Sequence, residues 1–164
     1  MSAVVAAPSR VDAAWRVLAS VLDPEVPALS VVDLGIVREV GDGDDGAIEI
    51  VLTPTYSGCP ATEAIEADIR AAMQSEGLGP VRIAYRLSPP WTTDWIGEDA
   101  KRKLAAYGIA PPGEAVVHVI ARNVPCPRCK SARTECLSAF GSTACKSLYR
   151  CLDCREPFEF FKPI

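Results

Sequence analysis

Cys59 is the residue of this sequence best placed to do chemistry, and it lies in the run Leu52-Thr53-Pro54-Thr55-Tyr56-Ser57-Gly58-Cys59-Pro60. A thiolate is both a nucleophile and a metal ligand. Gly58 allows a tight bend before the cysteine, and Pro60 suits the first turn of a helix, where its missing N–H leaves no hydrogen bond unmade. The dipole of that helix would favour the thiolate form. The alternative is a small buried hydrophobic residue, and the three hydroxyl side chains just before Gly58 favour function instead.

Two Cys-x-x-Cys pairs near the end of the chain are its most specific metal-binding signal. They are Cys126-Pro127-Arg128-Cys129 and Cys151-Leu152-Asp153-Cys154, separated by 21 residues. Each pair places two sulfur atoms on one tight turn, and two such turns make a tetrahedral thiolate site for zinc. A module this small cannot build a sufficient core alone, so we expect the metal to supply much of its folding free energy.

Two further cysteines, Cys136 and Cys145, are left without an assigned role. Cys145 precedes Lys146 in a turn-rich loop, where its thiol could be reactive or could bind a metal. Alternatively, one of the two could replace a paired cysteine as a ligand, so that the cysteines form a redox-sensitive iron–sulfur site. We favour zinc over iron–sulfur for the paired cysteines.

The elements that must position Cys59 are a strand before it and a helix after it. Hydrophobic residues alternate over 47–53, and they recur at three- and four-residue spacing over 61–76. A further alternating strand covers 81–87, and a strand–helix–strand unit makes the two strands parallel. The loop 88–95, with Trp91 and Trp95, leaves the same end of the sheet as Cys59, so its tryptophans either border a ligand or cover the core.

The remaining elements are predicted from capping signals and turn residues. Ser9 and Asp12 form a capping box for a helix that we expect to run to Asp23. A strand follows over 31–40, in which Asp33 must reach the surface, be hydrogen-bonded or line a site. The acidic run 41–46 is a hairpin turn rather than a nucleotide site.

A short helix over 98–107 ends at Gly108, and 110–113 is a linker. His118 is the single histidine and lies in an apolar run over 116–120, so we predict a structural role in a strand. One histidine cannot build a catalytic triad or a histidine-rich metal site, and it leaves Cys59 without an obvious base.

Composition indicates a globular protein of 164 residues, 49% hydrophobic and 23% charged. We expect an α/β (α+β) fold, a small mixed sheet with helices over residues 1–112, followed by a zinc ribbon over 113–164, with separate cores. No secretion signal or membrane-length apolar run is present, so we expect a cytoplasmic protein that does not enter membranes. Residues 1–117 carry a net charge of −8 and residues 118–164 a net charge of +4, and an acidic protein is a poor binder of nucleic acid.

Three motifs resemble the MIP18 (DUF59) family of iron–sulfur cluster assembly factors over roughly residues 9 to 108. They are Asp23-Pro24-Glu25, Asp33-Leu34-Gly35 and the run from Thr53 to Pro60. With Pro90-Trp91-Thr92-Thr93-Asp94-Trp95 and Phe140-Gly141-Ser142-Thr143-Ala144-Cys145-Lys146, nearly the whole chain resembles the D subunits of bacterial phenylacetyl-CoA epoxidase systems. In one departure, Tyr56 stands where many family members have a small hydroxyl residue.

The resemblance implies a pocket formed by Asp23, Glu25, Thr55 and Cys59. It implies an accessory maturation factor in phenylacetate catabolism that assists assembly or repair of an iron–sulfur cluster or iron centre, without catalysis of its own. The cofactors would be structural zinc and a transient iron or iron–sulfur cluster. The partners would be the oxygenase or reductase components of the epoxidase, the iron–sulfur assembly machinery and a second copy of the chain.

Two other functions stay open. A cysteine-dependent enzyme could act on a CoA thioester through Cys59, although no histidine base supports it. The zinc ribbon could instead be an interaction module, including one for nucleic acid, which the acidic charge of the whole chain opposes.

Overall fold

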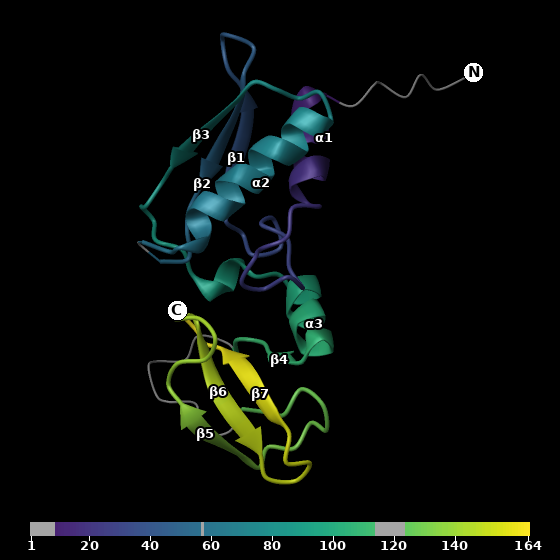
Figure 1. Ribbon diagram of the computed structural model, residues 1–164, viewed down its shortest axis with the longest axis vertical. Helices are drawn as coiled ribbons and strands as arrows, with labels where there is room; N and C mark the ends of the chain where they lie inside the picture. The colour runs from purple at the N-terminus through teal and green to yellow at the C-terminus, as the bar shows by residue number, and fades with distance from the viewer. Residues whose placement is uncertain (1–8, 57, 114–123) are drawn as a thin grey trace, which may run out of the picture.

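The computed structural model describes residues 9–56, 58–113 and 124–164. Ser57 and the expected strand over 116–120 with His118 lie outside the described residues. Figure 1 shows one sheet at each end of an elongated molecule, with α3 between them. The elements are α1 (Arg10–Leu18), β1 (Val37–Asp42), β2 (Ile48–Leu52), α2 (Ala61–Ser75), β3 (Val81–Tyr85), the 3-10 helix η1 (Thr93–Trp95), α3 (Glu98–Tyr107), β4 (Ile109–Ala110), β5 (Thr134–Ser138), β6 (Lys146–Cys151) and β7 (Pro157–Phe161).

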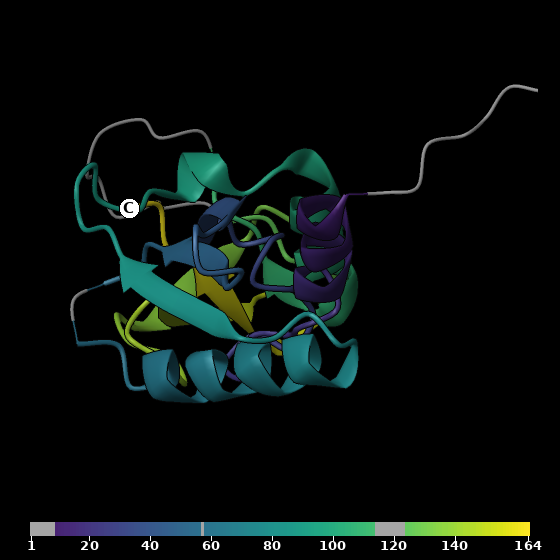
Figure 2. The same ribbon diagram turned by 90° about the horizontal axis from the view of Figure 1, so that it is seen from above.

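The N-terminal sheet has the strand order β1-β2-β3. β1 and β2 form an antiparallel hairpin through the acidic turn, and β2 and β3 are parallel, as predicted. α2 makes the connection between the parallel strands and lies along β3, with α1 packed against α2 and β1 (Figure 2). The predicted small mixed sheet with helices is therefore confirmed. In this arrangement a loop joins the end of β2 to the start of α2.

The first helix begins as predicted and ends earlier than predicted. The Ser9 side chain accepts a hydrogen bond from the backbone of Asp12, and the Asp12 carboxylate accepts one in return. The helix ends at Leu18 because the backbone after it forms hydrogen bonds with another segment. Val31 N–H donates to Val21 C=O at 2.9 Å, and Asp23 N–H donates to Leu29 C=O at 2.9 Å. These tertiary hydrogen bonds replace continued helix and hold residues 22–30 as a loop.

The strand predicted over 31–40 begins only at Val37. Residues before it form a turn, in which Gly35 has a φ of +69° and a Cβ would lie 2.8 Å from the Trp95 Cβ atom. Asp33 therefore lies in a turn, where its Oδ2 accepts hydrogen bonds from Ser30 N–H at 3.0 Å and from Lys103 Nζ at 2.7 Å. Burial acts to raise the pKa of Asp33, but these hydrogen bonds and the charge of Lys103 prevail and lower it. Asp33 thus has a structural role.

The C-terminal sheet has the strand order β4-β7-β6-β5, and β5 to β7 with the paired cysteines form what we call the ribbon, residues 124–164. β4 pairs in parallel with β7, so the ribbon sheet includes Ile109 and Ala110 from the preceding segment. An aromatic cluster of Tyr149, Phe158 and Phe160 is buried within it.

The two modules have distinct buried clusters, as expected, but they are not fully separate. Phe161 at the end of β7 is 1% exposed and belongs to the core of the N-terminal module, as does Cys145. Its ring lies 6.2 Å from that of Trp91, whose Nε1 donates to Leu34 C=O at 2.8 Å. Trp91 therefore covers the core, and Trp95 lies under the guanidinium of Arg38. The ribbon therefore keeps a buried cluster of its own and also inserts two side chains into the N-terminal core.

Among residues 9–56, 58–113 and 124–164, no helix has the length and hydrophobicity needed to cross a membrane.

Candidate functional site

Cys59 lies where the sequence predicts, between the end of β2 and the start of α2. It directly precedes Pro60, the N-cap residue of α2, and its carbonyl accepts a hydrogen bond from Thr62 N–H at 3.1 Å. Gly58 has a φ of +80°, a left-handed conformation that glycine adopts without strain. Cys59 is half-buried and packs against the core.

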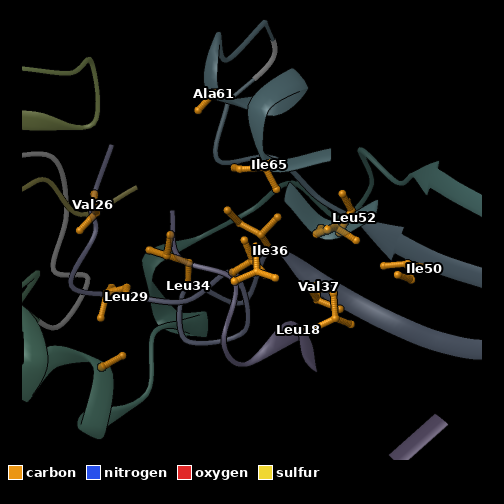
Figure 3. Close-up of a cluster of buried hydrophobic side chains, with 14 of the residues drawn as sticks. Leu18, Val26, Leu29, Leu34, Ile36, Val37, Ile50, Leu52, Ala61 and Ile65 are labelled. Atoms are coloured by element: carbon orange, nitrogen blue, oxygen red, sulfur yellow. The ribbon is translucent and has the colours of Figure 1, made fainter. Parts of the chain in front are cut away.

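The four pocket residues expected from the resemblance border one cavity. Asp23 and Glu25 come from the loop after α1, and Thr55 and Cys59 from the loop between β2 and α2. The cavity has a volume of about 20 Å³, enough for a water molecule or a single ion. Much of its lining is apolar, and Figure 3 shows these side chains within one cluster, with Leu34 and Ile36 between the others: Val26, Leu34, Ile36, Leu52 and Ile65.

Asp23 is fixed at the edge of this cavity. Its side chain is 5% exposed, and its Oδ1 accepts hydrogen bonds from Glu25 N–H at 2.8 Å and Val26 N–H at 2.7 Å. Burial raises the pKa of Asp23 even though these bonds and Lys146 act in the opposite direction. Burial and the charge of Asp23 also raise the pKa of Glu25. A cation bound beside two such carboxyl groups would stabilise their ionised forms.

Tyr56, the departure from the family pattern, contacts the thiol. Burial, a hydrogen bond to Cys59 and the nearby charges of Cys59 and Glu25 raise the pKa of Tyr56 to about 12. The phenol of Tyr56 therefore keeps its proton at neutral pH.

The ribbon contributes to the same cavity, which the sequence did not reveal. Cys145 borders it, and its neighbour Lys146 is buried. Lys146 Nζ donates to the backbone carbonyl of Glu25 at 3.2 Å and pairs with Glu159 at 2.9 Å. The adjacent cysteine and lysine in the run Phe140 to Lys146 were the signal that could have found this contact.

The four paired cysteines converge as predicted. Their sulfur atoms all lie within 4.8 Å of one another, with Cys126 and Cys154 at 3.7 Å and Cys129 and Cys151 at 3.5 Å. A tetrahedron with zinc–sulfur bonds of about 2.3 Å has edges of about 3.8 Å, so the donor set fits zinc. Cys136 and Cys145 do not join this cluster.

Both turns that carry these cysteines end in the same way. Lys130 and Arg155, each directly after the second cysteine of its pair, have φ values of 64° and 63°. Burial acts to raise the pKa of Cys151, but hydrogen bonds from the backbone of Cys154 and Asp153 prevail and lower it to about 6. The backbone of Glu156 acts to lower the pKa of Cys154, but burial and the neighbouring thiols raise it to about 12, so the turn favours the thiolate at Cys151 and the thiol at Cys154.

Comparison with known proteins defines the class. Residues 12–83 match the family of iron-sulfur cluster assembly proteins, and residues 111–162 match the PaaD zinc beta ribbon domain. The crystal structure of a DUF59 domain of unknown function from Bacillus anthracis superposes with a TM-score of 0.54 at 25% identity, over 58% of this chain and 91% of that one. An Fe-S protein maturation auxiliary factor of Porphyromonas gingivalis is 37% identical over 90 residues, 54% of this chain and 85% of that protein. The protein is a DUF59-type iron–sulfur assembly domain joined to a zinc ribbon.

A longer match identifies the particular family. An Escherichia coli K12 protein, named provisionally as the D subunit of a 1,2-phenylacetyl-CoA epoxidase, is 50% identical over 159 residues, which cover 96% of both chains. The chain belongs to this family of epoxidase D subunits. The resemblance seen in the sequence is confirmed over both modules.

Proposed function

We propose that this protein is an accessory factor that assembles or repairs an iron centre or iron–sulfur cluster of a phenylacetyl-CoA epoxidase, and that it holds iron transiently at Cys59. The observation that carries the proposal is that Cys59, Asp23 and Glu25 border a cavity of about 20 Å³. That volume suits a single ion, and carboxylates beside a thiol suit a metal carrier better than a thiol hydrolase.

The donors of this cavity suit weak, exchangeable binding. A thiol and two carboxylates are ligands for a divalent iron ion, but among the described residues only the ribbon cysteines form a group of three or more donors within 4.8 Å of one another. A metal held by separated donors is released more readily than one in a closed tetrahedral site. Ready release is what a carrier needs.

The zinc site and the partners follow from the same proposal. One zinc ion bound by Cys126, Cys129, Cys151 and Cys154 stabilises the ribbon without taking part in chemistry. The clients are the oxygenase or reductase components of the epoxidase, and the iron comes from the iron–sulfur assembly machinery. The protein acts in the cytoplasm, where thiols remain reduced, as a monomer or a homodimer, and without catalytic turnover of its own.

The test is Cys59→Ser in cells that lack the native protein, with growth on phenylacetate measured beside the melting temperature of the purified variant. Serine is close in size to cysteine but provides no thiolate at neutral pH, so growth should fail while stability falls by less than about 1 kcal/mol. Cys136→Ser is the matched control, because Cys136 is exposed on β5 and its thiol donates to Ser138 C=O. Normal growth of the Cys59 variant would refute the proposal, and a large loss of stability would assign Cys59 to the core instead.

A further inference from the structure

Two thiols from different modules border the cavity. Cys59 comes from the loop between β2 and α2, and Cys145 comes from the turn just before β6. The other described cysteines are placed differently: four belong to the metal cluster, and Cys136 is exposed on β5. Within the described residues, Cys145 is therefore the thiol available to act together with Cys59.

The position of Cys145 is fixed by its neighbours. The residue is 4% exposed, its sulfur lies 3.0 Å from Thr143 Oγ1, and its carbonyl accepts a hydrogen bond from Lys162 N–H at 3.0 Å. These contacts join the turn to the residue that follows β7. The sulfur is consequently held at the cavity rather than free to move away into solvent.

Lys146 holds this turn against the carboxylate loop. Its side chain is 3% exposed, and its ammonium bridges Glu25 C=O in the N-terminal module and Glu159 in the ribbon. Glu159 also accepts a hydrogen bond from Ser142 N–H at 2.6 Å, which fixes the start of the turn. A buried ammonium that joins two modules fixes the position of the adjacent sulfur relative to Asp23 and Glu25.

The donors around the cavity are complementary in kind. Asp23 and Glu25 offer hard oxygen ligands, and the two cysteines offer softer sulfur ligands. No three of these four donor atoms lie within 4.8 Å of one another, so a bound ion would draw them together. Ferrous iron accepts both kinds, whereas Mg²⁺ and Ca²⁺ bind oxygen alone. A second sulfur therefore gives the site a preference for a thiophilic metal that Cys59 alone provides only weakly.

We propose that Cys145 is a second sulfur ligand of the iron that Cys59 takes up, so that the ion is held between the two modules. The inference rests on the proposed function, because it concerns the same cargo. Ferrous iron binds as each thiol releases one proton to solvent, and the oxidation state of iron does not change. The ribbon is then part of the iron site as well as a zinc-stabilised module.

The experiment is an anaerobic Fe²⁺ titration of the zinc-loaded full-length protein in competition with a colorimetric ferrous chelator. The wild type is expected to bind one Fe²⁺ per chain. Cys59→Ser and Cys145→Ser should each weaken binding at least tenfold, and Cys136→Ser should leave it unchanged. Wild-type affinity in Cys145→Ser, with binding lost in Cys59→Ser, would overturn this inference and leave the proposed function standing. Wild-type affinity in Cys59→Ser would overturn both.

A second measurement decides the question even if Cys145→Ser does not fold. Co²⁺ replaces Fe²⁺ as a spectroscopic probe in wild-type protein whose ribbon zinc is shown by metal analysis to be retained. The sulfur-to-cobalt charge-transfer band grows with the number of thiolate ligands, so its intensity should correspond to two thiolates. An intensity corresponding to one thiolate would refute a role for Cys145 as ligand.

Discussion

Replacing Phe161 by alanine tests whether the ribbon completes the N-terminal core. The ring is 1% exposed and pairs with Trp91 at a centroid distance of 6.2 Å. Removing a buried phenylalanine side chain costs about 3–5 kcal/mol, which includes the cavity left behind. With a urea dependence of about 2 kcal/mol per molar, the unfolding midpoint should fall by about 1.5–2.5 M.

Tryptophan fluorescence during urea unfolding provides the assay. All three tryptophans, Trp15, Trp91 and Trp95, lie in the N-terminal module, so their emission reports the unfolding of that module and the contact of Trp91 with Phe161. Phe140→Ala is the matched control, because Phe140 is 66% exposed and contacts Lys162 through its ring face. Its midpoint should move by less than about 0.5 M, equivalent to about 1 kcal/mol. An equally small shift for Phe161→Ala would refute the contribution of the ribbon to the N-terminal core.

Two further predictions concern the site and the metal. Asp23→Asn should raise the melting temperature at pH 7, because burial raises the pKa of Asp23 and the wild type must ionise a buried carboxyl at that pH. The difference between the two proteins should disappear as the pH falls toward the ordinary aspartate pKa of about 4. A higher melting temperature of the variant that persists at low pH would contradict this cause. Cys129→Ser should abolish the binding of one zinc ion per chain, as measured by metal analysis. It should also shift tryptophan emission, because Phe161 and Cys145 leave the N-terminal core when the ribbon unfolds. Unchanged zinc content would contradict the ligand set, and unchanged emission would contradict the coupling of the modules.

Local signals predicted most of the elements correctly. The capping box at Ser9, the amphipathic pattern of α2 and the left-handed Gly108 after α3 all depend on residues close in sequence. The paired cysteines were equally readable, because each pair fixes two ligands on one turn. Such features need no knowledge of what packs against them.

The errors came from long-range contacts. α1 ends at Leu18 because the backbone near Val21 bonds to residues 29–31, and periodicity does not encode such a bond. Asp33 looked like a strand residue because its neighbours are β-branched, yet Lys103 and Ser30 hold it in a turn. Both cases are tertiary interactions that override local preference.

The candidate site was predicted in part. The resemblance supplied Asp23, Glu25, Thr55 and Cys59, and the structure brings all four to one cavity. Their role in iron transfer stays a prediction. The sequence marked Cys145 beside Lys146 as a reactive thiol or a metal ligand, but it did not place the two residues at this cavity, because that depends on how the ribbon docks against the loop after α1.

The insertion of Phe161 and Cys145 into the N-terminal core has a consequence for biosynthesis. Chains emerge from the ribosome with the N-terminus first, so Cys59 and its carboxylate neighbours are exposed to the cell before these core residues exist. At a synthesis rate of about 5–20 residues per second, the delay between Cys59 and Phe161 is on the order of ten seconds. A nascent chain that carries only the N-terminal module cannot yet offer the complete site, because Cys145 and Phe161 line the cavity and Phe161 ends β7.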